Sequence, residues 1–178
     1  QSAHKQTTTP TTPTTPTALE RGIEQLEQAI VAKRVTQAQL QLSKVEKLQE
    51  NSEEKMHLGA KLVSLRASVT KLSAARDAQI KKTIAKARRQ LQSADFNQVE
   101  ASLKKLKQLN APEASYAKIG SKLHTARTAL TQARQHYAKA DCRRTMTSLK
   151  PIIAVTPRSK RVAKLVDACR QALPPQRL

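Results

Sequence analysis

The feature that most constrains this chain is an internal repeat. Residues 91–130 have two looser copies elsewhere in the sequence. One copy, in the first half of the chain, aligns without a gap and places residues 58–62 on residues 119–123. The other follows residue 130 and places the Ala-Asp pair at 140–141 on the same pair at 94–95. Stacked copies of one unit share their apolar cores with their neighbours, so the repeat predicts a solenoid and not a fold around one central core.

The composition predicts helices and no strands. Gly is scarce, at 3 residues, and aromatic residues make up 2% of the chain, while Ala, Leu, Gln, Lys and Arg are abundant. These abundant residues favour helices. We therefore expect an all-α helical repeat of about three helical-hairpin units, with about seven helices in which long connecting helices are shared between units. The units are expected at about 24–69, 84–130 and 130–173.

The two ends of the chain differ from this helical part. Residues 1–17 are rich in Thr and Pro, with Pro at every third position from Pro10 to Pro16, which blocks a helix and favours an extended tether. The helical repeat domain is expected over 18–173, and 174–178 form a C-terminal tail. A tether has two ends, so we expect an N-terminal membrane anchor or a further domain.

Start and stop signals place the individual helices. One long helix is expected from about 53 to 94, and a second from about 113 to 140. Asp95 and Asp141 lie where helix N-caps are needed, and residues 156–157, Thr-Pro, are expected to be the N-cap and first residue of the last helix.

Two glycines recur at one repeat position within helices. Gly59 and Gly120 are both expected where helices cross too closely for a larger side chain, because Gly within a helix costs about 1 kcal/mol relative to Ala.

The repeated order over residues 24–173 is an apolar helix, an Ala-Asp turn, a Leu-rich helix and a Pro-marked loop. This order resembles tetratricopeptide-like helical repeats, and the resemblance implies a protein-interaction scaffold.

The sequence offers no constellation that is typical of catalysis. The four histidines, His4, His57, His124 and His136, are scattered and have no carboxylate or Cys at metal-ligand spacing. There is no Gly-rich phosphate loop, no HExxH motif and no Ser elbow. We therefore expect no enzyme, with no catalytic, cofactor-binding or metal-binding residues.

The distribution of charge is the main functional signal. The formal net charge is +20, of which residues 18–69 contribute +1 and residues 70–178 contribute +18. A solvated face does not require a single sign of charge, and the self-repulsion indicates contact with an anionic partner. The candidate binding residues are Lys82, Lys86, Arg89, Lys104, Lys105, Arg143, Arg144, Arg158, Lys160, Arg161 and Lys164.

Two classes of partner stay open. The aromatic residues of the helical part, Phe96, Tyr116 and Tyr137, lie at apolar or repeat positions, which disfavours the base stacking of single-strand binding. The first class is an acidic protein or an anionic cell-envelope polymer, bound by a tethered, non-enzymatic interaction or sensor module of a bacterial envelope protein. The second is nucleic acid, bound without sequence specificity by an intracellular protein.

The two cysteines bear on this choice. Cys142 precedes the Thr156-Pro157 turn by nearly the same length of chain as Cys169 follows it, so an antiparallel hairpin brings them close together. Both align with apolar positions of the other copies. They form either a disulfide or an inert core pair. We expect the disulfide, which implies an oxidising compartment such as the periplasm.

Overall fold

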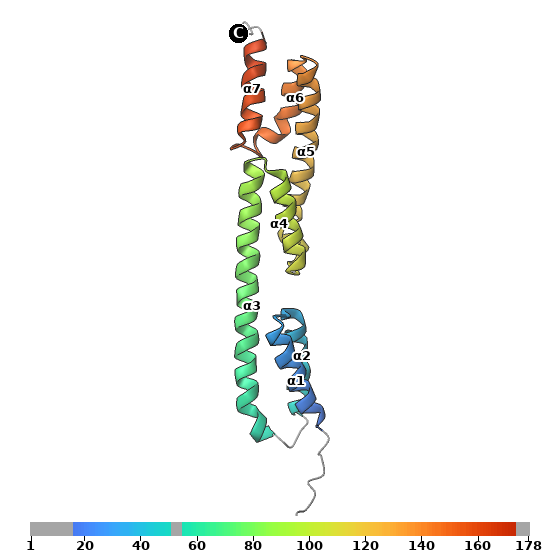
Figure 1. Cartoon of the computed structure of the whole chain (residues 1–178), viewed down its shortest axis with the longest axis vertical. Helices are drawn as coiled ribbons and strands as arrows, with labels where there is room; N and C mark the ends of the chain where they lie inside the picture. Colours follow the sequence, from blue (N-terminus) through green and yellow to red (C-terminus); the bar gives the residue numbers. More distant parts are fainter. Residues whose placement is uncertain (1–15, 51–54, 174–178) are drawn as a thin grey trace, which may run out of the picture. The chain divides into compact units, whose positions relative to one another are not determined.

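The computed structural model of the chain describes residues 16–50 and 55–173 (Figure 1). Within these residues there are seven α-helices, one short 3-10 helix and no strand. Along the chain they are α1 Ala18–Val31, α2 Val35–Glu50, α3 Lys55–Gln92, α4 Phe96–Gln108, η1 Glu113–Ser115, α5 Ala117–Ala138, α6 Cys142–Ile153 and α7 Lys160–Ala172. The predicted all-α class and helix number are confirmed. The solenoid stays a prediction, and most of the predicted linker and all of the predicted tail lie outside the described residues.

The chain divides into two compact units. Unit 1 comprises residues 1–75 and unit 2 comprises residues 76–178. The boundary lies inside α3, which is the long helix that the sequence predicts over about 53–94. Each unit has its own apolar clusters.

Unit 1 is built by α1, α2 and the first part of α3. Leu19 and Ile23 lie on one face of α1, at helical spacing, and are buried against Val45 of α2 and Leu62 of α3. A second cluster follows further along α1, where Leu26 is fully buried. This apolar stripe fixes which face of α1 turns inward.

Ion pairs join the helices of unit 1 at the rim of this core. Lys61 of α3 lies 2.9 Å from the Glu27 carboxylate of α1. Arg66 of α3 donates to Glu46 of α2, with its Nε 2.9 Å from Oε1. Two ion pairs thus join α3 to α1 and to α2 in unit 1.

Unit 2 contains the rest of α3 and the helices that follow it. One apolar cluster is formed by α3, α4 and α5, with Leu106 fully buried. A second is formed by α5, α6 and α7, with Leu149 and Ile152 fully buried. Phe96, at the start of α4, packs against both clusters. The long helix α5 therefore supplies a face to each cluster.

The turn between paired helices is the same at all three aligned positions. Lys33, Ala94 and Ala140 each adopt a left-handed backbone, with φ of 55 to 57°. In each turn the amide of the next residue donates to the carbonyl five positions back, at 2.9 to 3.0 Å, which closes a Schellman motif at the helix end. The sequence repeat thus corresponds to a repeated backbone conformation.

The starts of α4, α5 and α6 agree with the sequence predictions to different degrees. Asp141 caps α6 as predicted, because its Oδ1 accepts from the Arg144 amide at 2.9 Å. Asp95 is at the N-cap of α4, but its side chain makes no capping hydrogen bond. The second long helix is shorter than predicted, since η1 precedes α5 and α5 begins only at Ala117.

The predicted start of the last helix is wrong. Ser159 is the N-cap of α7, and its hydroxyl accepts from the Val162 amide at 3.3 Å. Thr156 is buried instead, and its hydroxyl donates to the Ile152 carbonyl at 2.9 Å at the end of α6. Thr156 therefore ends one helix and does not begin the next.

The predicted role of the two recurring glycines is also wrong. A Cβ added to Gly59 would meet no atom within 4 Å. At Gly120 the nearest atom would be Leu103 Cδ1 at 3.9 Å, which is an ordinary contact. The close approach occurs at Gly22, where a Cβ would lie 3.0 Å from Val45 Cγ2. A glycine in unit 1 thus permits the tight contact between α1 and α2.

Candidate functional site

A row of basic side chains runs along the part of α3 that belongs to unit 2. Lys82, Lys86 and Arg89 are all exposed. The buried residues of this part of α3, such as Ala87 and Leu91, lie on its other face and belong to the core. The predicted orientation of the basic row away from the core is confirmed, while its binding role stays a prediction.

The other predicted binding residues are exposed as well. They are Lys104 and Lys105 on α4, Arg143 and Arg144 on α6, Arg158 in the loop after α6, and Lys160, Arg161 and Lys164 on α7. Among all the predicted residues, only Arg144 forms an ion pair with a described residue, from its Nε to Asp141 Oδ2 at 3.5 Å.

Most of the positive charge of unit 2 is not compensated within the unit. Between described residues of unit 2 there are three ion pairs, made by Arg76, Arg127 and Arg144. Two of them join residues that are close in sequence, and only Arg127 links two helices. Most basic residues of the described part of unit 2 therefore lie at the surface without an acidic partner in that part of the chain.

Two hollows of unit 2 gather basic side chains. The first has a volume of about 340 Å³ and lies between the end of α3, the start of α5 and the loop after α6. Arg88 lines it from α3, and Lys118 and Lys122 line it from α5. None of these three side chains has a polar partner among the described residues. The lining contains no acidic residue, and Leu91 and Ile119 give it an apolar part.

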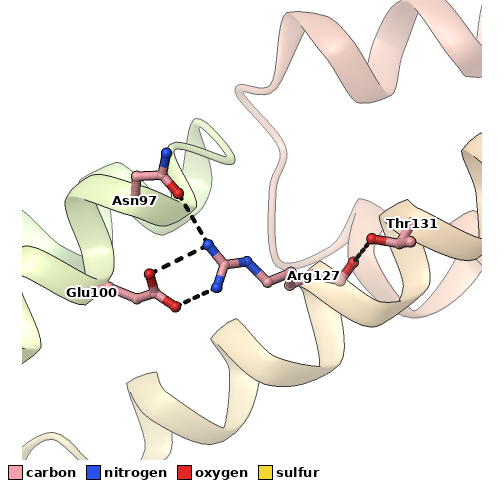
Figure 2. Close-up of polar contacts among 4 residues, drawn as sticks. All are labelled: Asn97, Glu100, Arg127 and Thr131. Atoms are coloured by element: carbon pink, nitrogen blue, oxygen red, sulfur yellow. Dashed lines mark hydrogen bonds and ion pairs between the residues drawn. The ribbon is translucent and has the colours of Figure 1, made fainter.

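The second hollow also has a volume of about 340 Å³, and its basic residues are Arg127 and Arg134 of α5 and Arg161 of α7. Figure 2 shows that α4 holds Arg127 in place: both terminal nitrogens donate to the Glu100 carboxylate, and Asn97 Oδ1 accepts a further bond at 3.0 Å. Arg134 and Arg161 are exposed, and the described part of the chain offers neither side chain a polar partner. These two guanidinium groups are therefore available to an anion.

The predicted residues are only partly brought together by these hollows. Arg161 lines the second hollow. Lys104 lines a third hollow together with Lys107, but Glu100 and Glu113 line it too, so its charges balance. Sequence reasoning missed Arg88, Lys118, Lys122 and Arg134, although each belongs to the basic part of the chain.

The two cysteines are close together in the core of unit 2. Both are buried free thiols, on α6 and α7. The pKa of the Cys169 thiol is raised to about 11, chiefly by burial and then by the interaction with the Cys142 thiol, while a hydrogen bond with Thr145 opposes this shift. The predicted proximity of the pair is confirmed. The disulfide itself stays a prediction.

Three further observations bear on the class of site. Within the described ranges, no group of three or more His, Cys, Asp or Glu side chains is arranged to hold a metal ion. The helices of those ranges include none with the length and apolar character to cross a membrane. No family model, curated protein or solved structure matches the chain.

Proposed function

We propose that unit 2 is a non-enzymatic interaction module that binds an acidic partner through its exposed basic residues. The partner is an acidic protein or an anionic cell-envelope polymer. The observation that carries this proposal is the absence of compensation: of the basic side chains in the described part of unit 2, three form ion pairs. Uncompensated charge of one sign opposes folding through self-repulsion, and an anionic partner removes that cost on binding.

The proposed context is a tethered module of a bacterial envelope protein. The Thr/Pro-rich sequence of residues 1–17 suits a tether, and the adjacent Cys142 and Cys169 thiols suit a disulfide in an oxidising compartment such as the periplasm. The resemblance to tetratricopeptide-like repeats supports a role in protein interaction. Each of these features fits an extracytoplasmic location.

Nucleic acid is the alternative partner. Tyr116 is buried and Phe96 is half-buried, so these two aromatic rings offer no open face on which single-strand bases stack. Tyr137 is 43% exposed, so among the three aromatic side chains it is the one that is accessible to a base. Duplex phosphates require only positive side chains, so sequence-nonspecific binding of a duplex by an intracellular protein is the form of this alternative that the basic surface supports.

Charge reversal within unit 2 tests the proposal. Fluorescently labelled poly-L-glutamate is titrated with the full chain and with a variant carrying Lys82→Glu, Lys86→Glu and Arg89→Glu, at several salt concentrations. We expect wild-type affinity to fall steeply with salt, and the variant to bind at least about tenfold more weakly with a flatter salt dependence.

The matched control carries Arg21→Glu, Lys33→Glu and Lys44→Glu in unit 1, which changes the net charge equally. It should retain affinity within about threefold, because the reversed residues lie outside the proposed surface. Equal losses in both variants would show that net charge alone matters. A duplex DNA arm separates the alternatives: preference for the duplex, with a salt slope of about 0.9 per phosphate contacted, would favour the nucleic-acid class.

A further inference from the structure

The repeat alignment relates the two basic hollows of unit 2 to each other. The alignment that places Asp141 on Asp95 also places Arg134 on Arg88. In the second half of the repeat, the alignment that places Val162 on Ile119 also places Arg161 on Lys118. Arg88 and Lys118 line the first hollow, and Arg134 and Arg161 line the second. The same two repeat positions therefore put a pair of cations into a hollow in both copies.

The first copy has the opposite charge at one of these positions. Its gapless alignment with the second copy places Glu27 on Arg88 and Lys61 on Lys122. In unit 1, Glu27 and Lys61 form an ion pair at 2.9 Å. In unit 2 the corresponding residues, Arg88 and Lys122, are both basic and line the first hollow. A position that closes a helix contact in unit 1 thus leaves two positive charges facing one space in unit 2.

The cations of each pair come from different helices. Arg88 lies on α3 and Lys118 on α5, while Arg134 lies on α5 and Arg161 on α7. A carboxylate is planar and suits the fork of a single guanidinium, whereas a phosphate group presents acceptor oxygens in several directions. Two cations that approach from two helices therefore suit a phosphate group better than a carboxylate.

We propose that the two repeat-equivalent pairs, Arg88 with Lys118 and Arg134 with Arg161, are two seats for phosphate groups of one flexible phosphate-linked polymer. This inference rests on the proposed function and names the chemistry of the partner. Each hollow has a volume of about 340 Å³, which is ample for a phosphate group. Two seats on one unit bind a chain more tightly than a single group, because the second contact becomes intramolecular.

One acidic residue limits the second seat. Asp95 lines that hollow, and its side chain makes no capping hydrogen bond to α4. Its carboxylate repels a bound phosphate, so the Asp95→Asn variant should bind more tightly by about threefold. This gain is a signature of an anion in the second hollow, since a general loss of structure would not produce it.

The experiment measures binding of short inorganic polyphosphate to the full chain by calorimetry. We expect each double variant, Arg88→Gln with Lys118→Gln and Arg134→Gln with Arg161→Gln, to lose at least about tenfold in affinity. The control, Lys139→Gln with Lys150→Gln, removes two exposed positive charges of unit 2 outside the hollows and should lose no more than about threefold. Arg134→Lys with Arg161→Lys retains the charge and should recover most of the binding, which excludes unfolding as the cause.

The outcomes separate this inference from the proposed function. Equal losses in the seat variants and the control would overturn the seats and leave charge-driven binding intact. Equal affinity for poly-L-glutamate and polyphosphate, with the same dependence on the seats, would overturn the phosphate preference. If the wild-type chain bound neither polymer, the proposed function and the inference would both fall. Flexible single-stranded DNA that matched polyphosphate in affinity and seat dependence would support the seats and identify nucleic acid as the source of the phosphates.

Discussion

The two units share a turn and differ in the use of charge. In unit 1 the left-handed turn residue is Lys33, and in unit 2 it is Ala94 and again Ala140, with nearly the same φ. Yet unit 1 joins its helices with cross-helix ion pairs, whereas the described part of unit 2 has one such pair, made by Arg127, and many cations outside any ion pair. Apolar stripes and turns therefore determine the helical hairpin in both units. The surface charge can differ between the units without changing that hairpin.

The energetics of surface charges agree with this separation. Exposed ion pairs contribute about 0 to 1 kcal/mol each, so unit 2 loses little stability by lacking them. The self-repulsion of its basic residues is a distributed cost that salt reduces. Charge is therefore the property in which the two units can diverge most without a change of fold.

The largest expected effect is the loss of stability when a core leucine of either unit is replaced by Ala. Leu26 in unit 1 and Leu149 in unit 2 are both fully buried, and either change to Ala should cost about 2 to 5 kcal/mol through the lost contacts and the cavity. Hydrogen exchange followed by mass spectrometry should show faster exchange of α1 and α2 amides in Leu26→Ala, and of α5 and α6 amides in Leu149→Ala. Faster exchange of α6 in Leu26→Ala would show that the units unfold together.

Oxidation of the two cysteines should increase the stability of unit 2 relative to unit 1. A bond between Cys142 and Cys169 would close a loop within unit 2 and stabilise it by about 3 kcal/mol. Unit 1 has no cysteine, so its stability should not change. Urea unfolding with and without reductant, followed by exchange in each unit, measures this effect. If mass spectrometry found two free thiols after purification under oxidising conditions, the argument for an oxidising compartment would lose its support.

In the reduced protein, alkaline pH should destabilise unit 2 through the Cys169 thiol. Its pKa is raised from 9.0 to about 11 in the folded protein, so the folded state holds the thiol proton more tightly. The associated stability is fully present below pH 9 and is lost as the pH rises through 11, with a total of about 2 to 3 kcal/mol. The variant Cys169→Ala keeps every lysine, which also titrates at alkaline pH. It should lack only the part of the pH-dependent loss of stability that Cys169 causes. An identical alkaline loss in that variant would assign the effect to other groups.

A Gly substitution at the left-handed turn residue should stabilise each unit by a similar, smaller amount. Ala140 and Lys33 are exposed and left-handed, a conformation that costs a residue with a Cβ about 1 kcal/mol and costs Gly nothing. Ala140→Gly should therefore stabilise unit 2, and Lys33→Gly unit 1, each by about 1 kcal/mol in urea unfolding. A gain in one unit alone would show that the shared turn geometry does not carry the same strain.

Local signals in the sequence predicted much of the fold. The N-cap at Asp141 and the long helix α3 follow from residues within a few positions of each element. The start of α7 was misplaced because Thr156 and Ser159 are both good caps. Burial of the Thr156 hydroxyl against the end of α6 decides between them, and that is a tertiary contact.

The candidate site was predicted less well than the fold. Charge counting identified the basic part of the chain and the exposed row on α3. It did not distinguish Arg88 or Arg134 from other basic residues, because only packing shows which of them face a hollow. The alignment of Glu27 with Arg88 is the sequence signal that marks the position, and its meaning depends on the ion pair seen in unit 1.

Lysine footprinting on the intact chain tests the central claim most directly, because both units are compared in one molecule. The chain is acetylated briefly with and without bound poly-L-glutamate or polyphosphate, and modification at each lysine is read by mass spectrometry. We predict protection of Lys82, Lys86 and Lys118 in unit 2, and unchanged modification of Lys33 and Lys44 in unit 1, which are exposed as well. Equal protection of lysines in both units would contradict the assignment of binding to unit 2.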